Sequence, residues 1–313
     1  MGDLSGIHGD LAVDLYRGLA VDRPHENVLF AISSVLAFLS EGSGSQTQKE
    51  ILSTLGISNR DNANRACSAW RVLVESLSRR GGEIHLATGS SLHVEKTFRL
   101  SPKFQNHSRG KWDKPFVRRH TVNWWFRVNG PLAVEVPMMF RDDTEVLKML
   151  YDTNCSFTVV RLPYAGPLAM LLLLPRGEMG QLCLHICLSV TRMKFWLTNL
   201  KPGRAEIRLP KFVLRRLYPL QSILKPTAVQ TLFTDLVDLS GFFPNRKLGL
   251  QAMHEAILEV DETESESQGG KSAMLDFSEP QSIIFDHPFM LLIYHEPTGT
   301  ILLIGKLTNL AEN

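Results

Sequence analysis

The chain has 313 residues, of which 44% are hydrophobic and 21% are charged, and its formal net charge is +2. A chain of this length and composition buries a substantial core, which excludes an intrinsically disordered protein. The near-neutral charge gives no reason to expect nucleic acid or an acidic membrane surface as a partner. The longest apolar stretch, Val28 to Leu39, is interrupted by two serines and is too short to span a bilayer.

The first predicted elements are helices. Apolar residues recur at helical spacing over residues 9–22 and again over 62–79. Residues 34–55 favour two helical pieces, because the Glu-Gly-Ser-Gly-Ser run at 41–45 interrupts the pattern.

From about Ile84 the hydrophobic period changes to two, which is typical of strands. Leu171 to Leu174 is fully apolar and suits a strand buried on both faces. Two strong strand patterns, Phe289 to Tyr294 and Thr300 to Leu307, are joined by a short turn that contains proline and glycine. Helices early and antiparallel strands late predict an α+β fold, in a single domain over residues 9–310.

The segment 261–282 differs from the rest of the chain. It is polar and charged, and it lies between the strand-like run Ala256 to Val260 and the C-terminal strands. A structureless stretch of this kind inside a compact domain is uncommon and usually functional. Because strands flank both its ends, we expect an anchored, exposed segment that a protease can bind.

Motifs for catalysis or metal binding are scarce. The chain has four cysteines without metal-ligand spacing, namely Cys67, Cys155, Cys183 and Cys187. A Cys183–Cys187 disulfide or redox pair is one interpretation, and ordinary part-buried thiols are the simpler one. His254 beside Glu255 fits a strand better than an acid–base site, and no G-x-S-x-G or H-E-x-x-H motif occurs. We therefore expect no enzyme activity, no metal and no cofactor.

Two motifs flank segment 261–282, namely Ala-Met-His-Glu-Ala-Ile-Leu-Glu-Val-Asp-Glu at residues 252–262 and Phe-Asp-His-Pro-Phe-Met-Leu-Leu-Ile at residues 285–293. Residues 252–262 and 285–293 resemble the strands before and after the serpin reactive loop. Further matches follow in family order, at Asn27–Phe30, Lys111–Phe116, Val136–Met139, Leu209–Phe212, Asp238–Gly241 and Gly299–Asn309. Because these matches cover nearly the whole chain, the resemblance is specific to the family, and it is closest in style to the plasminogen-activator-inhibitor group.

The resemblance implies the serpin fold and a serine-protease inhibitor that acts through an exposed reactive loop, here segment 261–282. In this family the cut loop inserts as a strand into the central sheet and traps the protease as an acyl-enzyme. The hinge of the loop would comprise Glu262, Thr263, Glu264, Ser265, Glu266 and Ser267. Counting back from Phe285 places the reactive bond at Phe277–Ser278, and counting forward from Glu262 gives Ser278–Glu279. Phe277 as the specificity residue implies a chymotrypsin-like rather than a trypsin-like protease.

Three departures from the family pattern concern the trapping step. A segment is missing between Phe104 and Arg109; it would contain an edge strand, the helix across the central sheet and the strand beside which the loop inserts. The Ser-Pro pair that the family has before its second helix is replaced by Ala31-Ile32, and Lys271 occupies a hinge position that insertion would bury. The alternative function is therefore a non-inhibitory binding protein, or an inactive form that cannot insert its loop.

The remaining predictions concern partners and location. A basic cluster is a candidate site for sulfated glycosaminoglycan, with a solvated surface as the alternative; it comprises Arg109, Lys111, Lys114, Arg118 and Arg119. Asn106 and Asn154 begin glycosylation motifs that are meaningful only in a secreted protein. The family implies an extracellular monomer, although no signal peptide is visible in this chain.

Overall fold

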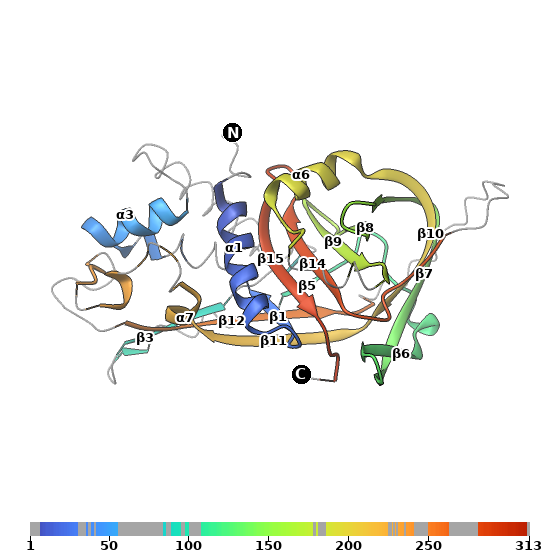
Figure 1. Cartoon of the computed structure of the whole chain (residues 1–313), viewed down its shortest axis with the longest axis horizontal. Helices are drawn as coiled ribbons and strands as arrows, with labels where there is room; N and C mark the ends of the chain where they lie inside the picture. The colour runs from blue at the N-terminus through green and yellow to red at the C-terminus, as the bar shows by residue number, and fades with distance from the viewer. Residues whose placement is uncertain are drawn as a thin grey trace.

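The computed structural model describes residues 7–30, 36, 39–40, 42–55, 84–85, 89–94, 98–99, 108–177, 180, 186–224, 227, 229, 231–234, 236–240, 250–262 and 281–311. Within these ranges two β-sheets dominate, and the helices pack on and beside them (Figure 1). The helices are α1 (Ile7–Asp22), α3 (Ser45–Thr54), α6 (Val190–Asn199) and α7 (Leu220–Leu224), with short 3-10 helices η2 (Arg118–His120) and η3 (Thr231–Phe233).

The larger sheet has nine strands within the described ranges, in the order β1-β15-β14-β9-β8-β7-β10-β13, and β6 pairs with β7. Its strands are β1 (Val28–Phe30), β6 (Val122–Asn129), β7 (Leu132–Asp152), β8 (Phe157–Pro163), β9 (Leu168–Pro175), β10 (Lys201–Pro210), β13 (Gln281–Ile284), β14 (Phe289–His295) and β15 (Thr300–Leu307). Neighbours are antiparallel except β10 and β13, which are parallel.

The smaller sheet has six strands within the same ranges, in the order β2-β5-β12-β3-β4, and β11 pairs with β12. Its strands are β2 (Ile84–His85), β3 (Gly89–Val94), β4 (Phe98–Arg99), β5 (Ser108–Gly110), β11 (Phe212–Pro219) and β12 (Leu250–Val260). Figure 1 shows β11 and β12 running along one side of the molecule, beneath the larger sheet.

The core lies on both faces of the larger sheet. Alternate residues of β9 point to opposite faces, so Leu171 and Leu173 join the hydrophobic cluster under α1 and α6. Met170 and Leu172 join the second cluster, which contains Leu258 of β12 and fills the space between the two sheets. This arrangement confirms the prediction of a strand buried on both faces, and it combines helices and antiparallel sheets as the α+β prediction requires.

Local sequence explains several element boundaries. α1 covers the helix predicted over residues 9–22, and α3 occupies the second predicted piece, beginning after Gly44. α6 begins after Ser189, whose hydroxyl accepts a hydrogen bond from the Arg192 backbone N–H at 3.0 Å. The turn between β14 and β15 places Gly299 at φ 66°, a conformation that glycine adopts without strain. The helix predicted over 62–79 lies outside the described residues.

Candidate functional site

The strand that leads into segment 261–282 ends on a buried aromatic cluster. β12 ends at Val260, and the next carbonyl oxygen, that of Asp261, accepts a hydrogen bond from the Trp112 indole Nε1 at 2.9 Å. The Trp112 ring stacks on Tyr164 with centroids 4.6 Å apart and meets Phe116 edge-on. Because the indole is buried and held by two other rings, it fixes the point where the chain leaves β12.

Glu262, the first residue of the predicted hinge, is held by its side chain. Its carboxylate accepts hydrogen bonds from Lys211 Nζ at 2.7 Å and from Thr121 Oγ1 at 2.8 Å. Burial by itself raises the pKa of this carboxyl, but the hydrogen bonds from Lys211, from its own backbone and from Thr121 lower the pKa below its ordinary value. Glu262 is therefore ionised at neutral pH although its side chain is only 7% exposed.

The end of segment 261–282 is fixed by backbone pairing. Gln281 to Ile284 form β13, which adds in parallel to β10. The next backbone N–H, that of Phe285, donates to the Arg208 carbonyl at 2.9 Å. The Phe285 ring is fully buried and packs edge-on against Phe289, with centroids 5.1 Å apart. These contacts fix the point where the chain returns to the sheet.

Asp286 adds a polar network to this second anchor. Its carboxylate accepts a hydrogen bond from Arg127 Nη2 at 3.1 Å and lies 2.8 Å from His287 Nδ1. The Arg127 backbone N–H donates to the Asp286 carbonyl at 2.7 Å, and His287 Nε2 lies 2.8 Å from the Pro175 carbonyl oxygen. Burial raises the pKa of Asp286, but hydrogen bonds from His287 and Arg127 lower it overall. The return point is thus tied to β6 and to the end of β9.

The sheet around β12 is where the resemblance predicts loop insertion. Along one edge of β12, β11 pairs from Phe212 opposite Val260 to Pro219 opposite Met253. Along the other edge, β3 pairs antiparallel with Leu250–Glu255, and β5 pairs parallel with Leu258–Glu259. The predicted gap therefore does not leave this edge of β12 open, because β3 and β5 pair with it directly.

This pairing opposes insertion of another strand. Residues 108–110 of β5 directly follow the predicted gap, so the missing strand would lie on the side of β12 where β3 and β5 now pair. A strand that folds back beside β12 runs antiparallel to it, hence antiparallel to β5 but parallel to β3. Insertion there would break the β3–β12 pairing. The new strand would then pair antiparallel with β12 and parallel with β3.

The structure places only part of the predicted site. The reactive bond Phe277–Ser278, the hinge residues 263–267 and Asn106 lie outside the described residues. Asn154 is exposed in the turn before β8, which suits a glycosylation acceptor. His254 is buried within β12, and burial lowers its pKa to about 4, so it is neutral and serves the strand rather than an acid–base site.

The basic cluster extends along the connection from β5 to β6, where only some of its side chains reach solvent. Lys111, Arg118 and Arg119 are exposed, and Lys114 is half-buried. For Arg109 the structure gives the backbone position alone, in β5. The exposed members follow the chain past the Trp112 anchor, close in sequence to the Thr121 hydroxyl that binds Glu262.

Sequence reasoning missed several residues of the anchors, among them Arg127, which holds Asp286. Trp112 and Lys211 stood within family motifs but had no assigned role, and Thr121 was not considered. Lys211 and Thr121 lie 51 and 141 positions from Glu262 along the chain, so no local pattern connects them. The only available signal was charge, since Lys211 is a cation in a strand-forming motif.

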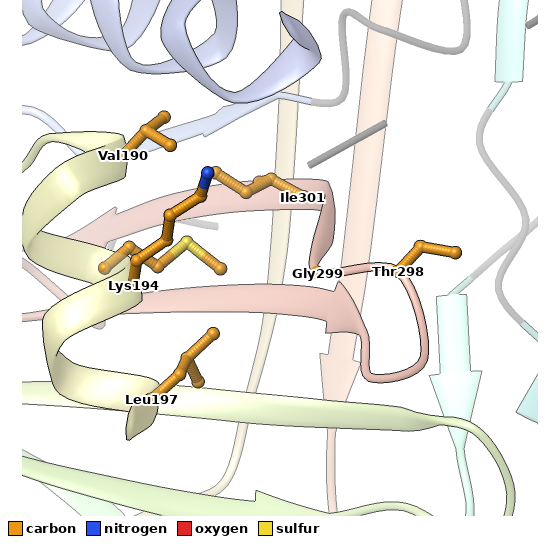
Figure 2. A pocket seen from close by; sticks show the side chains of 7 residues that line it. Val190, Lys194, Leu197, Thr298, Gly299 and Ile301 are labelled. Carbon is orange, nitrogen blue, oxygen red and sulfur yellow. The ribbon is translucent and has the colours of Figure 1, made fainter. Parts of the chain in front are cut away.

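A small pocket lies between α6 and the turn of the last hairpin (Figure 2). Its volume is about 190 Å³, and its lining is mostly apolar, from Val190, Met193, Lys194, Leu197, Thr298, Gly299 and Ile301. Small-molecule sites typically enclose about 300–1,000 Å³. The anchored segment, rather than this pocket, is therefore the candidate functional site.

Two other kinds of site are absent from the described ranges. They contain no group of three or more His, Cys, Asp or Glu side chains that could hold a metal ion. No helix within them is both long and apolar enough to cross a membrane. Cys155 is a buried free thiol whose sulfur lies 3.4 Å from Arg192 Nε, and Cys187 is half-buried.

Comparison with protein families gives a match over nearly the whole chain. The family described as serpin (serine protease inhibitor) matches residues 7–109 and 106–310. The two stretches meet at 106–109, next to the point where the sequence predicts a missing segment. This break supports the predicted gap.

Individual relatives give the same result. Alpha-1-antitrypsin 1-3 of Mus musculus is 27% identical, over 96% of this chain and 88% of that protein. The alignment extends over 365 positions, more than this chain of 313 residues can fill, so part of the relative has no counterpart here. Plasma serine protease inhibitor of Homo sapiens is 27% identical, over 95% of this chain and 88% of that protein.

Among solved structures, human thyroxine-binding globulin in its complex with thyroxine superposes with a TM-score of 0.79 at 26% identity, covering 98% of both chains. The names of these relatives include a protease inhibitor and a thyroxine-binding globulin, so likeness alone does not choose between inhibition and binding. None of the three names tests the plasminogen-activator-inhibitor subgroup, which stays a prediction.

Proposed function

The chain belongs to the serpin family, and from this premise we propose that it acts on a serine protease, as an inhibitor that presents segment 261–282 as bait. The observation that carries the proposal is the fixation of both ends of that segment. Trp112 and Lys211 hold its start, and β10 and Arg127 hold its end. Fixed ends lower the entropy lost when a protease binds the residues between them. The proposal assigns the chain no catalytic residue of its own.

The proposed reactive bond is Phe277–Ser278. An aromatic side chain fills the apolar primary pocket of a chymotrypsin-like protease, whereas a trypsin-like protease needs a cation there. The acidic neighbours Asp276 and Glu279 favour proteases whose binding cleft carries no negative charge next to the primary pocket. Mass spectrometry after limited chymotrypsin digestion tests the assignment. First cleavage at a bond other than Phe277–Ser278, or no cleavage within 271–280, would refute it.

A substitution sharpens this test. Phe277→Arg should transfer the first cut from chymotrypsin to trypsin without moving the site, because only the primary specificity residue changes. Ser278→Ala is the matched control, since it alters the other side of the proposed bond but leaves Phe277 in place. If Phe277→Arg leaves chymotrypsin cleavage unchanged, the protease cuts a different bond.

The pairing of β3 with β12 favours a second candidate, a non-inhibitory protein that is bound and cut without trapping the protease. Trapping requires the cut segment to enter the sheet beside β12, where Leu250–Glu255 already pair with β3. Insertion would also bury Lys271, and burying a cation without a partner costs several kcal/mol.

The two candidates give different products. An inhibitor of the serpin type forms a covalent complex with the protease that survives SDS, whereas a non-trapping protein is only cleaved. We expect cleavage to dominate for the unmodified chain. Lys271→Ala removes one obstacle and leaves the β3 pairing, so a marked rise in complex for this variant would show that the charge, rather than the sheet, limits trapping.

Membership of the family supports further proposals on location, glycosylation and glycosaminoglycan binding. We place the protein outside the cell as a monomer, with Asn106 and Asn154 as glycosylation sites. Arg118 and Arg119 are the exposed core of a proposed glycosaminoglycan site. The salt concentration that elutes the protein from a heparin column should fall when both become alanine, and an unchanged value would assign them to the solvated surface. A shift in mass on enzymatic deglycosylation of protein from mammalian cells would test the two asparagines.

A further inference from the structure

An arginine of the larger sheet is held by two aromatic rings. The guanidinium carbon of Arg208 lies 5.2 Å from the centre of the Trp124 ring and 5.1 Å from the centre of the Phe140 ring. The rings come from β6 and β7, and Phe140 stands directly opposite Arg208 in the pairing of β7 with β10. Because a cation is attracted to the faces of aromatic rings, these contacts fix the guanidinium without an acidic partner.

The charge of Arg208 is unpaired. Within the described ranges its side chain makes no hydrogen bond and no ion pair. Glu206 lies two residues earlier on the same face of β10, but the two side chains form no ion pair. The Nε atom is buried, whereas Nη1 and Nη2 are not, so the outer edge of the guanidinium reaches solvent. Such an edge offers two parallel N–H donors to an oxyanion.

The surroundings of this edge favour a planar anion with an apolar body. Trp124 is 38% exposed, and Val122, two residues earlier on the same face of β6, is 49% exposed. The face of an aromatic ring carries partial negative charge, so it repels oxygens that project out of the guanidinium plane. A carboxylate is planar and avoids this repulsion, whereas a sulfate is tetrahedral. Apolar atoms attached to the carboxylate can pack on Trp124 and Val122.

The described charges near this edge are mainly positive. The His120 ring centre lies 6.1 Å from that of Phe140, and Arg118 and Arg119 of the same 3-10 helix are exposed. Glu135 of β7 is exposed, but it points to the opposite face of that strand from Phe140. The local excess of cations favours an anionic ligand over a cationic one.

We propose that Arg208, Trp124 and Val122 form a binding site for a free organic acid, namely an aryl or alkyl carboxylate. Nη1 and Nη2 of Arg208 donate to the two carboxylate oxygens, and the apolar body of the ligand packs on Trp124 and Val122. The site does not depend on cleavage of segment 261–282. It is connected to the second anchor, because the Arg208 carbonyl accepts the hydrogen bond of the Phe285 backbone N–H.

Titration calorimetry with benzoate tests the site, at an ionic strength kept constant with sodium chloride. Benzoate should bind saturably and should raise Tm as its concentration increases. Acetate should bind about tenfold more weakly or less, because it has the same carboxylate but little apolar surface. Sulfate should show no saturable binding.

Variants assign the binding to these side chains. Arg208→Gln should lower the affinity for benzoate by about tenfold or more, because it removes the charged donors. Trp124→Ser should weaken the binding of benzoate but not that of acetate. Arg215→Gln is the matched control, since Arg215 is a largely exposed arginine of β11 in the smaller sheet. Its affinity for benzoate should stay within about twofold of that of the unmodified chain.

Arg208→Lys keeps the charge but loses the two-pronged donor, so it should also bind benzoate more weakly. This variant supplies the comparison if Arg208→Gln does not fold, as circular dichroism will show. Unchanged affinity in either folded Arg208 variant would overturn the proposal. Equal binding of benzoate and sulfate would reduce the effect to general ionic attraction and would also overturn it.

An acidic side chain of a peptide is the other source of a carboxylate. A capped peptide that carries glutamate beside leucine tests this source in the same titration. Stronger binding of benzoate than of the peptide supports a free acid as the ligand. Binding of the peptide without binding of benzoate would refute the assignment of a free organic acid.

Discussion

The anchors of segment 261–282 and the sheet that would receive it differ in how completely they are formed. The first anchor stands at the end of β12 in the smaller sheet, and the second belongs to the larger sheet, whose inner strands β9 and β14 are fully buried or nearly so. The receiving edge of β12 is bordered by β5, three residues long, and by the six residues of β3. Recognition and trapping are physically separate tasks, and this chain retains the framework for the first more completely than for the second.

The difference follows from what each task requires. Recognition needs two fixed points, and a few buried contacts such as those of Trp112 and Phe285 supply them. Trapping needs a full-length neighbour on each side of a new strand, because every inserted backbone N–H and C=O must find a partner. The predicted gap between Phe104 and Arg109 would leave the fixed points intact and remove one of the neighbours.

The largest expected effect comes from the second anchor. Phe285→Ala should lower the free energy of unfolding by about 3–5 kcal/mol, because it leaves a cavity beside Phe289. Urea unfolding measures the change. Val213→Ala, at a half-exposed position of β11, is the control and should cost less than about 1 kcal/mol. Equal losses for the two variants would mean that the anchor is not part of the stable core.

A smaller effect is expected at the first anchor. Trp112→Phe keeps a ring against Tyr164 but removes the indole N–H that donates to the Asp261 carbonyl. The lost hydrogen bond and the lost volume should cost about 1–3 kcal/mol in urea unfolding. Trp196→Phe makes the same change elsewhere in the core and tests whether any effect on cleavage of segment 261–282 is specific. Trp112→Phe alone should change the cleavage rate.

The smallest effect concerns charge at Glu262. Its pKa is lowered in the folded state, so its contribution to stability is present above the ordinary value of 4.5 and is lost as pH falls through the folded pKa. Glu262→Gln should cost about 1 kcal/mol at pH 7, because the variant keeps an acceptor for Thr121 but loses the charge facing Lys211.

The difference in unfolding free energy between Glu262→Gln and the unmodified chain should shrink as pH falls below 4.5. A difference that stays constant down to about pH 3 would show that ionisation of Glu262 does not hold the anchor. Glu259→Gln controls for the general effect of removing one carboxylate, since Glu259 lies on β12 outside the anchor.

Sequence alone predicted the elements whose patterns are local. β14 and β15 were predicted almost to the residue, because their apolar runs flank a turn with Gly299 at positive φ. The 21-residue strand β7 was not predicted at its full length, since its first part pairs with β6, its last part with β8 and most of its length with β10. Such partners are distant in sequence and leave no local pattern.

The same limit applied to the site. The two ends of segment 261–282 are anchored as its flanking strand patterns predicted, whereas the reactive bond within it and the gap stay predictions. The partners of Glu262 and the direct pairing of β3 with β12 could not be predicted, because they join residues far apart in the chain. The Glu262 contacts and the β3–β12 pairing depend on which parts of the chain the fold brings together, and the local sequence around each residue does not show this.

The most direct test of the account is thermal unfolding before and after cleavage of segment 261–282. Insertion of the cut segment would add a strand to the sheet and raise Tm, whereas the β3–β12 pairing and Lys271 oppose it. We predict a rise of less than about 5 °C, which corresponds to little new packing in a protein of this size. A rise of more than about 20 °C would mean many kcal/mol of new packing and would contradict the claim that recognition has outlasted trapping.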